Sequence, residues 1–214
     1  MATILKAGNA TTGLSLTPDS TGILELKTGT GSGTTAVTIS TAQVVTLAGA
    51  LTVTGNVSGA IKSGTAVAST SGTSIDFTGI PSTAKRITVM FNGVSTNGTS
   101  VVLIQLGSTT FSTSGYTATG LGSSTTALAT SNYTTGFGIA DSTAAASVYS
   151  GQIIISNISS NVWVASYVMT RGTQQIATGA GVSPSLAGVL DRVRITTVNG
   201  TDTFDAGSIN ILYE

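Results

Sequence analysis

The chain contains no cysteine and no histidine. The first absence excludes disulfides and thiolate metal sites, and the second removes the commonest general base and metal ligand. Charge is also scarce, because 7% of the residues are charged, against about 25% in an average soluble domain. Eight basic and eight acidic residues balance and are scattered, so we expect no nucleic-acid partner, which would require a basic stripe. The surface must therefore consist mainly of Ser, Thr, Asn, Gln and Gly.

No stretch of the chain shows helical periodicity, and no window approaches the roughly 18 consecutive apolar residues of a membrane helix. The N-terminal residues, MATILKAGNATTG, lack the pattern of a secretory signal, so we expect none. Apolar residues make up 40% of the chain and the formal net charge is zero, which disfavours disorder. Alternation of apolar and polar residues is clear at 85–91, 162–171 and 191–213, which predicts an all-β fold.

Three parts follow from changes in pattern along the chain. Residues 1–61 form an extended, β-rich segment. Eight of its large apolar residues fall on odd positions, namely Val37, Ile39, Val45, Leu47, Leu51, Val53, Val57 and Ile61. Such a thin strip cannot bury its apolar side alone, so we expect a homotrimeric stalk or anchor. Residues 62–74, small and polar, are predicted to be a linker. Residues 75–214 are predicted to be a β-sandwich of about eight strands, jelly-roll-like and here called the knob.

Within the knob, the pattern separates core strands from loops. The run VVLIQL at 101–106 is almost continuously apolar, which is typical of a central strand covered on both sides. Trp163 and Tyr167 share one face of a strand and are interpreted as core residues. The Gly-, Ser- and Thr-rich segments 107–135 and 172–190 are predicted to be loops.

Carboxylates are the main catalytic groups left in this composition. Asp202 and Asp205 lie close to Asn199, and such a cluster could bind calcium, cleave a glycosidic bond, or stabilise a turn through side-chain hydrogen bonds. We favour the turn and predict no catalytic residues, no metal and no cofactor. Arg192 and Arg194 face the same way on one strand, which we interpret as a solvated strand face rather than an anion site.

Several segments carry a resemblance to known proteins. The segment IDFTGIPSTAKRITVMFNGVSTNGTSVVLIQLG at 75–107, together with DRVRITTVNGTDTFDAGSINILYE at 191–214, resembles a C-terminal domain of tail-fibre-like and other structural proteins of tailed bacteriophages. The N-terminal 39 residues and the phrase ALTVTGNVSG at 50–59 are similar to the first part of such fibre proteins. The resemblance implies a virion protein on the tail or capsid exterior, generally trimeric, with a distal β-sandwich that contacts the host surface.

Two functions remain open on this basis. The first is a short trimeric tail fibre or spike, bound to other virion proteins through residues 1–61, whose knob contacts a host polysaccharide or outer-membrane protein. For this function we predict Tyr116, Tyr133 and Phe137 as contact residues, because aromatic residues in a Gly- and Ser-rich loop have no obvious core to fill. For Phe137, which precedes Gly138 and Ile139, a core position is an equal alternative. The second is a head fibre or capsid decoration that docks through residues 1–61 and binds no specific receptor. A depolymerase is disfavoured, since we expect so short a chain to lack a long carboxylate-lined groove.

Overall fold

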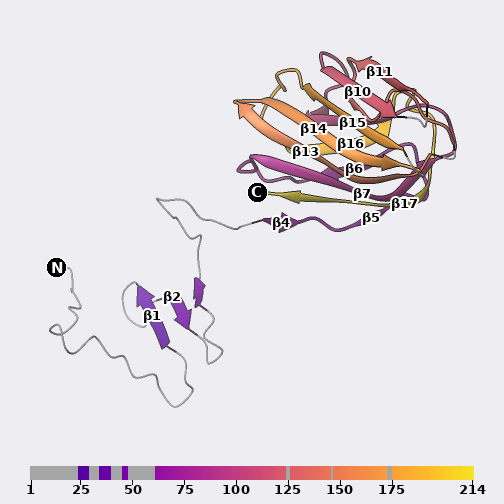
Figure 1. Ribbon diagram of the computed structural model, residues 1–214. Coiled ribbons are helices and arrows are strands. Elements are labelled where there is room, and N and C mark those ends of the chain that lie inside the picture. The colour runs from indigo at the N-terminus through magenta and orange to yellow at the C-terminus, as the bar shows by residue number, and fades with distance from the viewer. Residues whose placement is uncertain are drawn as a thin grey trace, which may run out of the picture. The chain divides into compact units, whose positions relative to one another are not determined.

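The computed structural model describes residues 61–214, apart from 124–125, 146 and 173–174, and three strands nearer the N-terminus. The chain divides into two compact units, residues 1–58 and 59–214. Every regular element described is a strand (Figure 1), so the predicted all-β class is confirmed. No helix in the described part of the chain is long and apolar enough to cross a membrane.

The N-terminal unit contributes an antiparallel sheet in the order β1-β2-β3. Its strands are β1 (Leu24–Thr28), β2 (Thr34–Ile39) and β3 (Val45–Leu47). The register places Val37 opposite Leu47 and Ile39 opposite Val45. Residues from the predicted odd-numbered apolar series are therefore paired across a small meander over this stretch. The rest of the predicted strip, from 48 to 60, lies outside the described residues.

The knob consists of two antiparallel sheets, and Figure 1 labels most of their strands. The first is nine-stranded in the order β11-β10-β15-β14-β13-β7-β17-β4, and β5 also pairs with β17. Its strands are β4 (Lys62–Ser63), β5 (Val67–Ala68), β7 (Arg86–Thr96), β10 (Thr117–Ser123), β11 (Leu128–Tyr133), β13 (Tyr149–Ser159), β14 (Val162–Arg171), β15 (Ile176–Val182) and β17 (Phe204–Tyr213). The second is five-stranded in the order β12-β8-β16-β6, and β9 pairs with β8. Its strands are β6 (Ile75–Thr78), β8 (Val102–Ser108), β9 (Thr110–Phe111), β12 (Phe137–Gly138) and β16 (Arg192–Thr197).

One hydrophobic core joins residues of both sheets. Alternate residues point into it, such as Ile87 and Val89 on β7 and Ile195 on β16, all with 0% exposure. Trp163 and Tyr167 are buried in the same core, as predicted. Strand β8 is buried from Val102 to Gly107 on both of its faces, which confirms the prediction of a covered central strand. The arrangement is a β-sandwich with more strands than the sequence predicts.

Residues 62–74, predicted to be a linker, belong to the knob instead. Strands β4 and β5 pair with β17, and the fully buried Ser69 donates its backbone N–H to the carbonyl of Gly207 at 2.9 Å. Main-chain hydrogen bonds attach this segment, and they need no large apolar side chains. A polar composition therefore does not distinguish it from a free linker.

Two segments predicted to be loops contain strands. Strands β9, β10 and β11 lie within 107–135, and β15 lies within 172–190. The inward positions of β10 and β15 are occupied by glycine and alanine. The Tyr167 side chain fills the space above Gly120 and Gly179, and Asp141 and Arg171 fill the space above Gly122. A Cβ atom at Gly179 would lie 2.6 Å from the Tyr167 hydroxyl. These strands therefore lack the alternating large apolar residues that reveal a strand in a sequence.

Candidate functional site

The three aromatic residues predicted to contact a partner, Tyr116, Tyr133 and Phe137, are all buried. Tyr116 meets Phe137 edge to face, with 5.1 Å between the ring centroids, and its hydroxyl accepts a hydrogen bond from the N–H of Leu106 at 2.8 Å. The Tyr133 hydroxyl donates to the carbonyl of Ala140 at 2.8 Å. Burial raises the pKa of both tyrosines to about 12. The premise that these rings have no core to fill is wrong, and they cannot reach a partner in this conformation.

Of the two acidic residues near the C-terminus, Asp202 stabilises a turn, whereas Asp205 lies on β17 and accepts a hydrogen bond from the Ser95 hydroxyl on β7. The side-chain oxygen of Asn199 accepts hydrogen bonds from the N–H groups of Thr201 and Asp202 at 3.0 and 3.2 Å. The Asp202 carboxylate accepts from the Ser100 N–H at 2.8 Å, which ties this turn to the one that precedes β8. These bonds confirm the turn interpretation for Asn199 and Asp202 but not for Asp205. Among the described residues no three acidic side chains gather in a group that could hold a metal ion.

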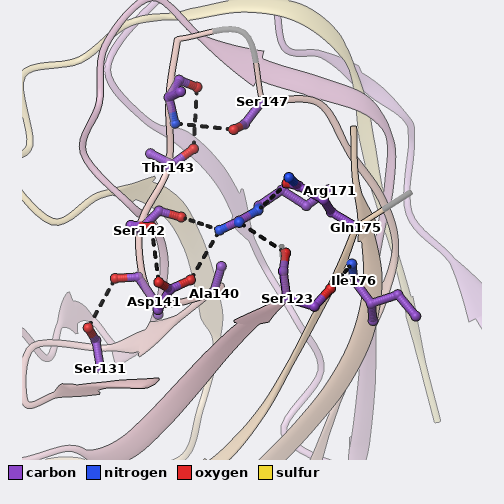
Figure 2. A network of polar contacts seen from close by, with 12 residues as sticks. Ser123, Ser131, Ala140, Asp141, Ser142, Thr143, Ser147, Arg171, Gln175 and Ile176 are labelled. Carbon is purple, nitrogen blue, oxygen red and sulfur yellow. Dashed lines mark hydrogen bonds and ion pairs between the residues drawn. The ribbon is translucent and has the colours of Figure 1, made fainter. Parts of the chain in front are cut away.

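Arg171 forms a buried polar cluster at the end of β14 (Figure 2). Its guanidinium lies 3.1 Å from the Asp141 carboxylate and donates to the carbonyls of Ser142 and Ser123 at 2.8 and 3.2 Å. A further bond goes from Nε to the Gln175 side chain at 3.1 Å. Every nitrogen of the guanidinium thus donates to the protein, which is how a buried charge is accommodated. The cluster joins the ends of β10 and β14 to the segment after β12, and we interpret it as a structural clamp.

A polar cleft of about 310 Å³ lies on the outer face of the five-stranded sheet. Leu103 and Gln105 on β8, with Arg194 and Thr196 on β16, line it. These positions alternate with the inward-pointing residues of the same strands, which identifies the face. The walls come from the segments before β6 and after β9, β11 and β16, at Thr73, Ser74, Thr113, Thr135, Asn199 and Gly200.

The floor of the cleft presents polar atoms that are held in place. Gln105 is only 7% exposed, and its amide nitrogen donates to the carbonyl of Thr135 at 2.9 Å. No described residue donates to the Gln105 side-chain oxygen, which leaves it as an acceptor. The hydroxyl of Thr196 donates to the carbonyl of Thr73 at 2.9 Å. Buried polar groups with fixed orientation are the usual means by which a pocket positions a ligand.

One side of the cleft is formed by Arg194, which is held by two neighbours. Its guanidinium makes two hydrogen bonds to the Asp76 carboxylate, at 2.8 and 2.7 Å, and lies 4.1 Å from the centre of the Phe111 ring. The bonds to Asp76 raise the pKa of Arg194. Arg192 is likewise paired with Asp191 at 2.7 Å, and its hydrogen bond lowers the pKa of that carboxyl. Both arginines are therefore neutralised locally and only partly exposed, rather than forming the solvated strand face that the sequence predicts.

The chemistry of the cleft suits an uncharged ligand with many hydroxyl groups. Its lining combines hydroxyl groups, a glutamine amide, an asparagine and a paired arginine, with few apolar atoms. Both oxygens of Asp76 are bound to Arg194, so this carboxylate is not placed as an acid or nucleophile. The arrangement can bind such a ligand through hydrogen bonds, but it offers no pair of catalytic carboxylates.

The sequence predicts only one part of the cleft, the strand that carries Arg192 and Arg194. The shared direction of Arg192 and Arg194 follows from their spacing, whereas Asp76 and Phe111 reach the site through pairing of distant strands. Asp76 lies directly opposite Arg194 in the β6–β16 register. Comparisons with family models, curated proteins and solved structures find no match to this chain.

Proposed function

We propose that this protein is a bacteriophage virion component whose knob attaches the particle to the host surface through the cleft on the five-stranded sheet. The observation that carries the proposal is the cleft itself, with its ordered floor at Gln105 and its neutralised Arg194. Sites built on strands hold their groups more precisely than sites on loops. The resemblance of residues 75–107 and 191–214 to phage fibre proteins supplies the virion context.

The ligand class follows from the lining of the cleft. An anionic ligand would require an unpaired cation, and each arginine near the cleft already has an aspartate partner. An apolar ligand would gain little from walls of threonine, serine and asparagine. A neutral saccharide unit of a host surface polysaccharide presents donors and acceptors of the matching kind. This function requires no cofactor and no catalytic step.

The N-terminal segment supplies attachment and self-association in this proposal. A sheet as small as β1-β2-β3 needs its apolar face covered to be stable, and packing of copies of residues 1–61 against one another in a homotrimer that docks on other virion proteins would cover it. The same segment would serve in the alternative function, a head fibre or capsid decoration without a specific receptor. Both functions place the protein on the virion exterior.

Binding at the cleft is tested with two neighbouring arginine substitutions. Thr113 and Ser114 are both exposed, but only Thr113 lines the cleft. The full chain is applied to an array of bacterial lipopolysaccharide and capsule glycans as the unsubstituted protein, Thr113→Arg and Ser114→Arg. We expect the unsubstituted protein and Ser114→Arg to bind the same glycans, and Thr113→Arg to bind at least about tenfold more weakly, because the long side chain obstructs the cleft. Equal binding by all three proteins would show that the cleft is not the binding site. Binding by none of them would contradict the proposal that the knob attaches to a saccharide.

Location on the particle is tested separately. Antibodies against residues 75–214 are applied to intact virions, which are then viewed by electron microscopy. Label at the end of the tail supports the attachment function. Label over the head supports the decoration function instead.

A further inference from the structure

The outer face of the nine-stranded sheet is exposed and carries aliphatic side chains. Ile154 on β13, Val168 on β14 and Ile176 on β15 are 36%, 65% and 51% exposed. They lie on three adjacent strands. Their neighbours on the same face are small or uncharged, and a shallow hollow of about 330 Å³ lies among Gln152, Ile154, Ser166, Val168 and Thr178. We call this surface the β13–β15 face.

This face has no exposed charge in its central strands. Among the residues of β10, β11, β13, β14 and β15, Arg171 is the one charged residue, and it is buried in its clamp. The outer face of the five-stranded sheet carries the ion pairs of Arg192 and Arg194 on its strand β16, whereas on the nine-stranded sheet the exposed ion pair Arg86–Glu214 lies at the end of β7, outside these five strands. Depletion of charge is characteristic of the core of protein–protein interfaces rather than of solvated surfaces.

Aliphatic and small polar residues alternate across the strands of this face. Val168 lies opposite Gln152 on β13 and Thr178 on β15. Ile154 lies opposite Ser166 on β14 and Thr88 on β7. Each protruding aliphatic side chain is therefore next to a shorter or polar one, so the surface has projections and hollows of similar spacing. Such relief allows the surfaces of neighbouring copies to interdigitate around a common axis, much as the facing layers of a sandwich do.

We propose that the knobs of different copies of this chain associate through the β13–β15 face. A partner with a charged surface would find no opposite charge here, whereas a second copy brings an equally neutral surface and no repulsion. Including β7 and β17, seven adjacent strands spaced about 4.8 Å apart and about seven residues long cover roughly 700 Å². That area is close to the approximately 800 Å² that each partner contributes to a stable interface. The added strands bring one exposed ion pair, Arg86–Glu214 at the end of β7, which is internally neutral and belongs to the polar rim of such an interface.

The inference deepens the homotrimer proposed above, by assigning a contact surface to the knob in addition to the N-terminal segment. Association through the knob also leaves the cleft available, because the cleft lies on the outer face of the other sheet. An assembly would therefore present several equivalent clefts at once, and multivalent binding strengthens attachment without any new contact to the ligand.

The test uses the absence of cysteine from the chain, which makes an introduced thiol unique. The full chain is prepared as Val168→Cys and, as a matched control, Val189→Cys; Val189 is 54% exposed in the loop between β15 and β16. Mass is measured by light scattering, and the rate of maleimide labelling is measured on the assembled protein. We expect an assembly of several copies in which the thiol at position 168 reacts at least about tenfold more slowly than the thiol at 189.

A charge substitution provides a second measurement on the same surface. We expect the assembly of the Val168→Lys variant to dissociate at a protein concentration at least about tenfold higher than the assembly of the Val189→Lys variant. The reason is that assembly through this face must desolvate an unpaired lysine at position 168 in each copy. If the protein assembles but the thiols at positions 168 and 189 react with maleimide at equal rates, the β13–β15 face is not the contact surface, although self-association stands. A monomeric unsubstituted chain would overturn both self-association and this face, whereas glycan binding by the cleft is decided by the array alone.

Discussion

At the scale of single residues, two arginine–aspartate pairs of the knob differ in their exposure. The side chains of Arg171 and Asp141 are 10% and 15% exposed, whereas those of Arg194 and Asp76 are 32% and 33% exposed. Removal of one member of a buried pair leaves an uncompensated charge, which costs about 3–5 kcal/mol. An exposed pair contributes about 1 kcal/mol or less, since water screens it.

We therefore predict that Arg171→Ala lowers the free energy of unfolding by about 3 kcal/mol, and that Arg194→Ala lowers it by less than about 1 kcal/mol. Urea titration followed by tryptophan fluorescence measures both values. Equal losses in the two variants would show that the Arg171 cluster is not the clamp inferred from its hydrogen bonds.

The buried tyrosines make stability sensitive to high pH. Desolvation raises the pKa of Tyr116 and Tyr133 from 10.0 to about 12, and burial also raises the pKa of Tyr149 and Tyr167. The folded state therefore holds these protons more tightly than the unfolded state does. This contribution to stability is complete below the unfolded pKa of 10.0 and is lost as the pH rises through about 12.

We predict that the protein unfolds in alkali between these two values, and that ionisation of the buried tyrosines accompanies unfolding. Tyrosinate absorbance and circular dichroism, recorded in one pH titration, should change together over this range. Ionisation of all the tyrosines while the dichroism spectrum stays native would contradict the prediction.

At the scale of elements, β10 and β15 depend on glycines that lie beneath Tyr167. The Tyr167 hydroxyl donates to the Gly138 carbonyl and accepts from the Ala140 N–H, both at 2.9 Å, which fixes the ring above Gly179. A methyl group at Gly179 would meet both this hydroxyl and the backbone of Thr119. Neither group is free to move without breaking hydrogen bonds between strands.

We predict that Gly179→Ala lowers the free energy of unfolding by about 1–3 kcal/mol, the usual cost of overpacking. Gly188→Ala is the control, because the added methyl there would meet only the rotatable Ser108 hydroxyl. Thermal unfolding of the two variants measures the difference. A Gly179→Ala variant as stable as Gly188→Ala would show that Tyr167 can shift.

The same glycines explain which elements the sequence predicts. Strand β7 is evident from Ile87, Val89 and Phe91, because large apolar side chains alternate within one segment. Strands β10 and β15 are not evident, because their inner space is filled by a side chain from β14. The cleft could not be predicted from the sequence for a similar reason. The outward direction of Arg194 follows from its strand pattern, but Asp76 lies 118 residues earlier and only the sheet register brings it close.

At the scale of the whole molecule, the scarcity of charge determines how an assembly responds to salt. Interfaces held by ion pairs weaken as salt screens them, whereas apolar contacts do not. Because the β13–β15 face carries no exposed charge in its central strands, we predict that the mass of the assembly is the same in dilute buffer and in about 1 M sodium chloride, where the Debye length is about 3 Å. Sedimentation velocity at both concentrations measures this, and dissociation in salt would point to charged contacts.

Strand β17 is the last strand of the knob and nevertheless lies between β7 and the pair β4 and β5. During synthesis, β7 leaves the ribosome about a hundred residues before its partner, a delay on the order of ten seconds at typical elongation rates. Throughout that interval the edge of β7 is unpaired, and so are β4 and β5. Neighbouring ribosomes on one message therefore hold several incomplete knobs that all await the same strand. Rapid release of β17 would favour pairing within its own chain over exchange between chains, which makes the timing of translation part of correct assembly.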